Sequence, residues 1–120
     1  MDQVEQVLAS LLEQVPGAIL AGLLGMDGIG VQVALGEDWQ ETDTQVVEVE
    51  LGALGAAVQE AAARLQAGPS PEFFLGTAQA NFLGMMVDPS YFLVLGLPPA
   101  SDLEQARAAL GQAREALVGY

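Results

Sequence analysis

The chain has 120 residues and a net charge of −13, with sixteen acidic side chains against three basic ones, Arg64, Arg107 and Arg114. Because it contains no lysine, histidine or cysteine, it lacks the residues on which most nucleophilic, general-base and zinc chemistry depends, and we expect no enzyme, no cofactor and no metal site. The scarcity of basic residues also argues against binding to nucleic acid or to an anionic membrane surface.

The first predicted element is a helix over residues 2–15. Its apolar residues recur every three or four positions, as on one face of a helix, and these are Val4, Val7, Leu8, Leu11 and Val15. Asp2 and Glu5 have the spacing of a capping box at its start, and Pro16-Gly17 ends it.

A two-stranded hairpin is expected next. Residues 18–25 form a continuous apolar run, whereas residues 31–35 alternate between apolar and smaller or polar side chains. The dipeptide Asp27-Gly28 lies between them and is typical of a tight hairpin turn.

The centre of the chain is predicted to be one long helix. It follows an acidic segment over residues 36–43, begins at a capping box of Thr42 and Gln45, and ends near Gly68-Pro69. One apolar stripe, fit to lie on a sheet, consists of Val47, Leu51, Leu54, Val58, Ala61 and Leu65. The reverse face is also apolar and carries Val49, Gly52, Ala53, Ala56 and Ala63. A helix that is apolar nearly all round is expected to be buried on both sides.

Three further strands are predicted over residues 72–76, 82–87 and 91–97. The connections between them are short and rich in turn-forming residues, so we expect an antiparallel meander. Pro98-Pro99 then ends the sheet.

The last predicted element is a helix that begins at a second capping box, Ser101 with Glu104. The expected order is helix, two strands, helix, three strands, helix. Because every connection is short, we expect a single α+β domain over residues 1–120.

This order resembles that of the roadblock family of dynein-light-chain-like proteins, in particular the bacterial or archaeal small-GTPase regulators, over almost the whole chain. The resemblance is carried by the run Leu11–Ala18 before the first strand, the turn Asp27-Gly28, the Ala- and Leu-rich middle helix, and a final helix after the strand Tyr91–Leu97. It implies a five-stranded antiparallel sheet with the long helix on one face and the two terminal helices on the other, a fold like that of profilin.

The resemblance also implies a homodimer, paired through the middle helix and the neighbouring edge strand. This agrees with the apolar reverse face of the middle helix, and with a hydrophobic share of 52%, which favours extra burial between subunits. The predicted interface consists of Val49, Gly52, Ala53, Ala56, Ala63, Phe73 and Leu75.

Bacterial and archaeal members of the family typically regulate Ras-like small GTPases, so the resemblance implies a homodimeric regulator that acts through protein contacts. Activation, inhibition and recruitment of the GTPase all stay open. One alternative is an adaptor dimer that tethers proteins without affecting nucleotide turnover, and another is a small-molecule sensor, which a large internal pocket would favour. The amino terminus lacks the positive charge of a signal peptide and the longest apolar run is about half a membrane span, so we expect a cytoplasmic protein.

The acidic segment before the middle helix is the candidate contact for a basic partner. We take Glu37, Asp38, Trp39, Glu41 and Glu48 as the partner-binding residues. Charge of one sign steers association, and aromatic residues are enriched at interface hot spots. The alternative interpretation is a solvated loop whose carboxylates favour the amino terminus of the following helix.

The three arginines are expected to serve the fold and not catalysis. Arg107 and Arg114 flank the apolar stripe of the last helix, where carboxylates such as Glu104 or Glu115 could pair with them. Arg64 lies in the last turn of the middle helix, where a positive charge suits the helix dipole. An arginine inserted into a GTPase site is therefore not expected.

Overall fold

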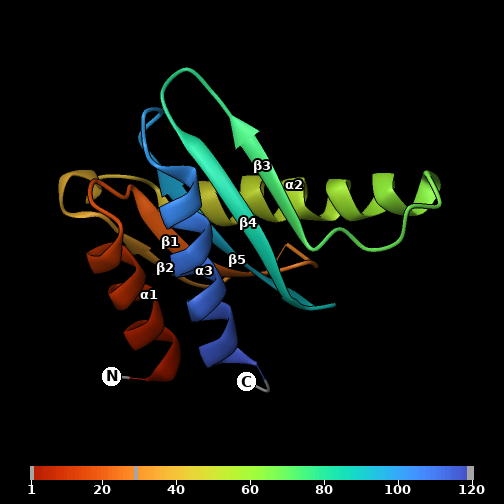
Figure 1. The fold of residues 1–120 in the computed structure, drawn as a ribbon, viewed down its shortest axis with the longest axis horizontal. Coiled ribbons are helices and arrows are strands. Elements are labelled where there is room, and N and C mark those ends of the chain that lie inside the picture. Colours follow the sequence, from red (N-terminus) through yellow and green to blue (C-terminus); the bar gives the residue numbers. More distant parts are fainter. Residues whose placement is uncertain (1, 29, 119–120) are drawn as a thin grey trace.

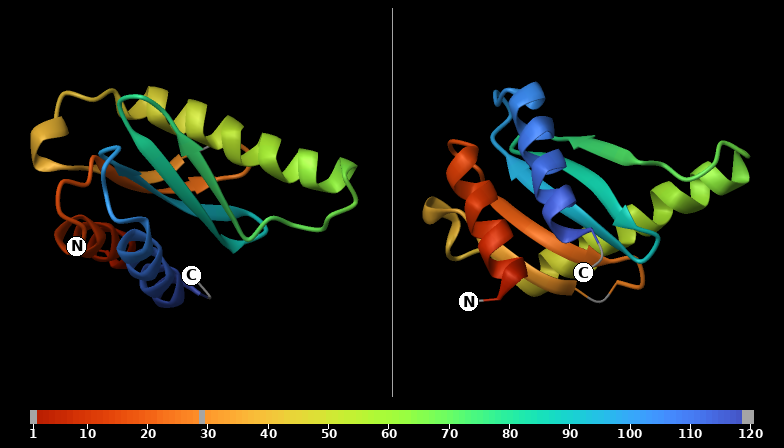
Figure 2. Two further views of the ribbon diagram at one scale, coloured as in Figure 1. Left: turned by 45° about the horizontal axis from the view of Figure 1, so that its top comes forward. Right: turned by 60° about the horizontal axis from the view of Figure 1, so that its bottom comes forward.

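In the computed structural model, which describes residues 2–28 and 30–118, a five-stranded antiparallel sheet lies between one long helix and a pair of shorter helices (Figures 1 and 2). The elements are α1 (Gln3–Gln14), β1 (Leu20–Gly25), β2 (Gly30–Leu35), the 3-10 turn η1 (Glu37–Trp39), α2 (Thr44–Arg64), β3 (Glu72–Gly76), β4 (Asn81–Asp88), β5 (Tyr91–Leu97) and α3 (Leu103–Leu117). The strand order is β2-β1-β5-β4-β3, so β2 and β3 are the edges. The predicted fold class and element order are confirmed.

The two central strands, β1 and β5, are buried on both faces of the sheet. Leu93 and Leu95 of β5 belong to the apolar cluster under α1 and α3, whereas Phe92 and Val94 belong to the cluster under α2. Successive side chains of a strand point to opposite faces, so one uninterrupted apolar run can supply both cores.

The helix starts correct two of the three predicted capping boxes. Asp2 caps α1 by accepting from the backbone N–H of Glu5, as predicted. For α2 the cap is Asp43 and not Thr42, and for α3 it is Asp102 and not Ser101. Each of these two carboxylates accepts two backbone N–H groups, and its negative charge also complements the helix dipole, which a hydroxyl cannot do.

The placement of α2 differs from the prediction in an informative way. The helix packs chiefly on β1 and β2, and its carboxyl-terminal turns project past the sheet (Figure 1). The predicted sheet-facing stripe is therefore covered only in its first part: Leu51 is buried, whereas Leu65 is 77% exposed.

Two glycines set this placement. A Cβ on Gly55 would lie 2.7 Å from the ring of Phe92, and one on Gly52 would lie 3.2 Å from the Cα of Gly28 in the β1–β2 turn. Gly52 thus faces its own hairpin and is buried within the protomer, whereas the sequence placed it on the reverse face, which was expected to be buried against a second copy.

Candidate functional site

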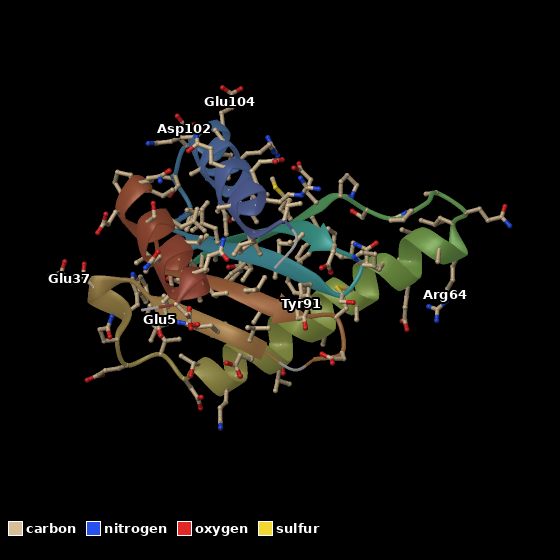
Figure 3. All side chains as sticks on the ribbon, turned by 90° about the horizontal axis from the view of Figure 1, so that it is seen from below. Glu5, Glu37, Arg64, Tyr91, Asp102 and Glu104 are labelled. Carbon is tan, nitrogen blue, oxygen red and sulfur yellow. The ribbon has the colours of Figure 1, made fainter. Side chains whose placement is uncertain are left out.

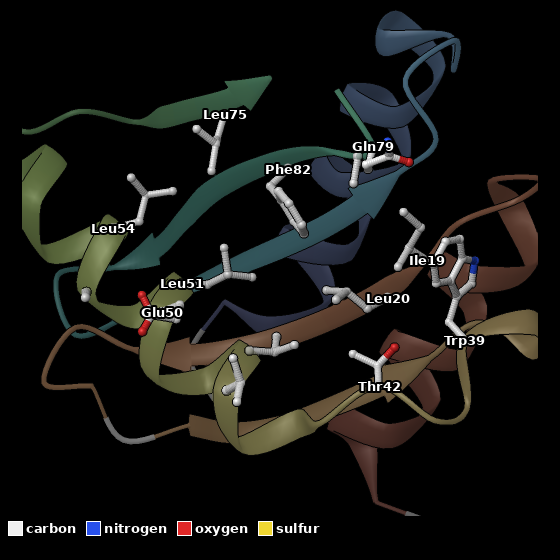
Figure 4. A pocket seen from close by; sticks show the side chains of 14 residues that line it. Ile19, Leu20, Trp39, Thr42, Glu50, Leu51, Leu54, Leu75, Gln79 and Phe82 are labelled. Atoms are coloured by element: carbon white, nitrogen blue, oxygen red, sulfur yellow. The ribbon is translucent and has the colours of Figure 1, made fainter. Parts of the chain in front are cut away.

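An open apolar trough runs between α2 and β3 on the face of the sheet that α2 covers only in part (Figure 4). Its volume is about 740 Å³. Leu54 of α2 and Leu75 of β3 face each other across it, and Trp39 stands at one end. The residues that line it are Ile19, Leu20, Trp39, Thr42, Val46, Val47, Glu50, Leu51, Ala53, Leu54, Leu75, Gln79, Ala80 and Phe82.

The trough exists because α2 lies over one end of the sheet. The glycine contacts hold the helix close to the hairpin, so the α2 side of β3 and β4 has little cover from its own chain. Within β3, Phe73 fills part of the gap by packing edge-on against Phe92, with ring centroids 5.5 Å apart. Leu75, one pleat further along, stays 36% exposed. Contiguous apolar surface of this kind is typical of interaction sites in proteins.

Of the predicted dimer residues, Ala53 and Leu75 line this trough, whereas the other five do not. Val49 is 58% exposed, and Ala53 and Ala63 are exposed as well. Ala56 and Phe73 are half-buried within the protomer.

Sequence reasoning missed the residues that form the floor and the near wall. Ile19 and Phe82 belong to strands, and Leu54 was assigned to the sheet-facing stripe of α2, so all three were treated as ordinary core. Val46, which is 56% exposed, was not singled out. The pair Gly52 and Gly55 was the available signal, because two glycines on one side of a helix permit close approach there and shift the helix off the rest of the sheet.

The acidic segment forms the turn η1, whose backbone is fixed by hydrogen bonds. The N–H of Trp39 donates to the carbonyl of Gly36 over 3.0 Å, and Nε2 of Gln40 donates to the carbonyls of Leu35 and Gly36 over 3.1 Å each. The side chain of Trp39 is nevertheless 42% exposed. An aromatic side chain presented on a rigid turn is suited to contact another molecule.

The predicted partner-binding residues do not all gather at this turn. Glu37, Asp38 and Glu41 are exposed around Trp39 and line the same surface hollow. Glu48 lies elsewhere, with its side chain against the backbone of Gly30 at the start of β2.

The three arginines each contact their own chain. Arg107 pairs through Nε with both carboxylate oxygens of Glu72, at 3.0 and 3.3 Å, and not with Glu104 as predicted. Because Glu72 begins β3, this pair joins α3 to the edge of the sheet.

The other two arginines form ion pairs with glutamates close by in the sequence, and Arg114 also has a backbone partner. Nε of Arg114 donates to the carbonyl of Met86 over 2.7 Å and its NH1 lies 3.3 Å from Glu115, the second of which was predicted. Arg64 lies 3.9 Å from Glu60 on the projecting end of α2, opposite the acidic turn marked by Glu37 (Figure 3).

No helix within residues 2–28 and 30–118 has the length and apolarity needed to cross a bilayer. No group of three acidic side chains suited to hold a metal ion occurs there either.

Solved structures share this fold over nearly the whole chain. A Roadblock/LC7 domain from Streptomyces avermitilis superposes with a TM-score of 0.85 at 15% identity, covering 99% of this chain and 98% of its own. MglB of Myxococcus xanthus reaches a TM-score of 0.88 at 19% identity, with 99% and 94% covered. MglC of the same organism is 26% identical with a TM-score of 0.71, and 98% of each chain is covered.

The likeness is one of fold more than of sequence. Neither a protein-family model nor a curated protein sequence matches the chain. Profilin II of Acanthamoeba castellanii shares the arrangement more distantly, with a TM-score of 0.59 at 12% identity over 97% of this chain and 94% of its own. The fold that the resemblance implied is thereby confirmed, and the chain has a roadblock-like fold.

Proposed function

We propose that this chain forms a homodimer through the apolar trough and that the dimer binds and regulates a Ras-like small GTPase. The observation that carries the proposal is the trough itself, bordered by an apolar helix face on one side and the edge strand β3 on the other. A second copy offers the same helix face and the same strand edge, as a two-fold interface requires.

The geometry of α2 supports an antiparallel pairing of two such helices. Ala56 is midway in sequence between Val47, which lines the trough, and Leu65, which is exposed on the projecting end. With the two-fold axis at Ala56, Leu65 of each copy would lie level with Val47 of the other. The exposed leucine of one copy would then fill the trough of its neighbour, which removes apolar surface from water on both sides.

The same pairing is electrostatically favourable. Arg64, beside Leu65, would lie level with Glu48 of the second copy. Because Glu48 packs against Gly30 of its own protomer, the nearby carboxylate that faces the trough is Glu50. The acidic start of each helix would thus meet the one basic residue of the other helix, and charge complementarity of this kind fixes the register of an interface.

Regulation, in this proposal, works through the catalytic residues of the GTPase. Arg107 and Arg114 are paired within the protomer, and in the proposed dimer Arg64 would lie against the second copy. A regulator can accelerate GTP hydrolysis by supplying an arginine in trans, or by ordering the GTPase's own switch residues. Because the arginines of this chain have other partners, we propose the second way. Family resemblance and the rigid acidic turn beside α2 support this mode of action.

The test is binding to the small GTPase of the same organism, loaded in turn with GDP and with a non-hydrolysable GTP analogue. A regulator needs different affinities for the two states, and we expect a preference of about tenfold or more for the triphosphate form. Calorimetric titration measures both affinities directly. Equal affinity for the two forms would favour the adaptor dimer instead, and turnover assays would then show no change in hydrolysis.

A further inference from the structure

A second hollow lies on the α1 side of Trp39, away from the trough. Its volume is about 380 Å³. It is formed by the last turn of α1, the α1–β1 connection, the end of β2 and the turn η1, and three carboxylates surround it, Glu13, Glu37 and Asp38. Trp39 is the one residue that lines both this hollow and the trough.

The walls of this acidic hollow combine an apolar surface with negative charge. Leu12, Ala18 and the indole of Trp39 supply the apolar part. Glu13, Glu37 and Asp38 are all exposed at the surface. The whole sequence has only three basic side chains, and these pair with Glu60, Glu72 and Glu115. Within the part of the chain that the structure describes, the carboxylates of the hollow thus form no ion pair with an arginine.

We propose that this acidic hollow is a docking site for a basic side chain, arginine in preference to lysine, carried by an exposed segment of a partner protein. The guanidinium lies against the face of the Trp39 indole and pairs with the carboxylates of Glu37, Asp38 and Glu13. The proposal rests on the proposed function in one respect, that the chain acts by binding other proteins, and it names the chemistry of the segment that is bound.

Three physical arguments select this occupant. A cation over an indole is attracted by the ring quadrupole, and tryptophan is the best of the aromatic residues in this role. A planar guanidinium can stack on the ring and still donate to carboxylates at its edge, whereas an ammonium cannot do both equally well. The volume of the hollow lies near the lower end of the range for ligand sites, which suits one or two side chains and not a helix.

The site is also pre-organised. The hydrogen bonds of Trp39 and Gln40 to the backbone of Gly36 fix the turn, and the N–H of Gly36 donates to the carbonyl of Ile19 over 2.7 Å. Binding therefore orders few groups that are not already fixed, which lowers its entropic cost. Trp39 is the one lining residue that the hollow shares with the trough, so the three carboxylates lie outside the surface that a second copy in the trough would cover.

The position of Trp39 provides a direct assay, because it is the chain's only tryptophan. The probe is a blocked five-residue peptide with two arginines flanking a leucine, titrated while the indole fluorescence is recorded. The matched probe has citrulline, which is neutral and nearly isosteric, in place of each arginine. We expect a saturable fluorescence change with the arginine peptide, weakened by salt, and none with the citrulline peptide.

Two double variants with the same net charge locate the effect. Glu37→Gln with Asp38→Asn removes two carboxylates from the hollow, and we expect about a tenfold loss of affinity. Glu5→Gln with Glu104→Gln removes two carboxylates from the first turns of α1 and α3, and we expect unchanged affinity. Glu37, Asp38 and Glu104 are exposed and Glu5 is half-buried, and circular dichroism should confirm that both variants fold.

Three results would overturn the proposal. These are an absence of saturable binding, equal binding of the citrulline peptide, and equal weakening by the two double variants, which would show general attraction to an acidic protein. No GTPase is present in this assay, so its failure would leave the nucleotide-dependent binding described above untouched. Conversely, peptide binding with the expected pattern would stand even if the GTPase showed no nucleotide preference.

Discussion

At the scale of single residues, glycine decides how closely the layers of this fold approach one another. Gly55 allows α2 to rest on the ring of Phe92, which is itself fully buried. Gly84 plays the same part on β4, where a side chain would collide with the ring of Phe73. The two phenylalanines then meet edge to face, so the two glycines together build one aromatic contact under α2.

Gly55→Ala tests this role against a matched helical glycine. A methyl group at this position would force a buried ring to move, and overpacking of this kind costs about 1–3 kcal/mol, which exceeds the gain in helix propensity. We expect a lower free energy of unfolding in urea denaturation. Gly111→Ala in α3 meets no atom within 4 Å, so it should raise that free energy by about 0.5–1 kcal/mol. Stabilisation by both substitutions would contradict the close packing of α2.

At the scale of elements, the start of α2 depends on one carboxylate. Asp43 accepts from the N–H groups of Gln45 and Val46, whereas the backbone N–H of Thr42 still belongs to the preceding turn, donating to the carbonyl of Trp39. These hydrogen bonds therefore leave the connection between η1 and α2 little conformational freedom. The cap fixes where the exposed valines of α2, Val46 and Val49, stand relative to Trp39.

Asp43→Ala should therefore destabilise the chain more than Thr42→Ala does. Loss of an N-cap side chain costs about 1 kcal/mol, and we expect a loss of this size in thermal or urea denaturation of the Asp43 variant. The Thr42 variant should lie within about 0.5 kcal/mol of the parent, as surface substitutions usually do. If the two variants unfold in the opposite order, the cap assignment is wrong.

The elements themselves could be predicted from sequence because each carries a local signal. The periodicity of residues 3–14 and the turn at Asp27-Gly28 act over a few positions, and the structure agrees with both. The pair between Arg107 and Glu72 could not be predicted, since its partners are 35 residues apart and meet only when α3 packs on the sheet.

The residue types of the candidate site could be predicted from the sequence, but the shapes of the trough and of the acidic hollow could not. The apolar all-round character of α2 indicated a second buried face, and Trp39 was recognised as a possible anchor. The trough between Leu54 and Leu75 follows from where α2 sits on the sheet, which depends on distant glycine contacts and not on the helix's own periodicity. The acidic hollow likewise joins Glu13 to residues of η1 that lie more than twenty positions away.

At the scale of the whole molecule, the protomer covers one face of its sheet well and the other poorly. Helices α1 and α3 lie side by side over a continuous core, whereas α2 alone serves the opposite face (Figure 2). Exposed apolar side chains gather on the poorly covered side, among them Val46, Val49 and Leu75. This asymmetry is what a subunit of a larger assembly would show.

Ala53→Glu tests the assembly without disturbing the protomer, because Ala53 lines the trough and is exposed in a single copy. We expect the parent to elute in light-scattering chromatography at twice the mass of 12.5 kDa, and the variant at the single mass, since a buried unpaired charge opposes association. Ala108→Glu, at an exposed position of α3, is the matched control and should keep the dimer. A dimer that survives Ala53→Glu would place the interface elsewhere.

Most residues of a small domain affect both its stability and its binding to partners, but residues on the projecting end of α2 affect mainly binding. From Ala61 to Leu65 every residue except the half-buried Ala62 is exposed, so these positions add little to the stability of a single copy. Substitutions there should change the affinity for a partner more than the stability of the protomer. Choice and strength of partner can therefore change over evolution along this short stretch while the rest of the domain stays as it is.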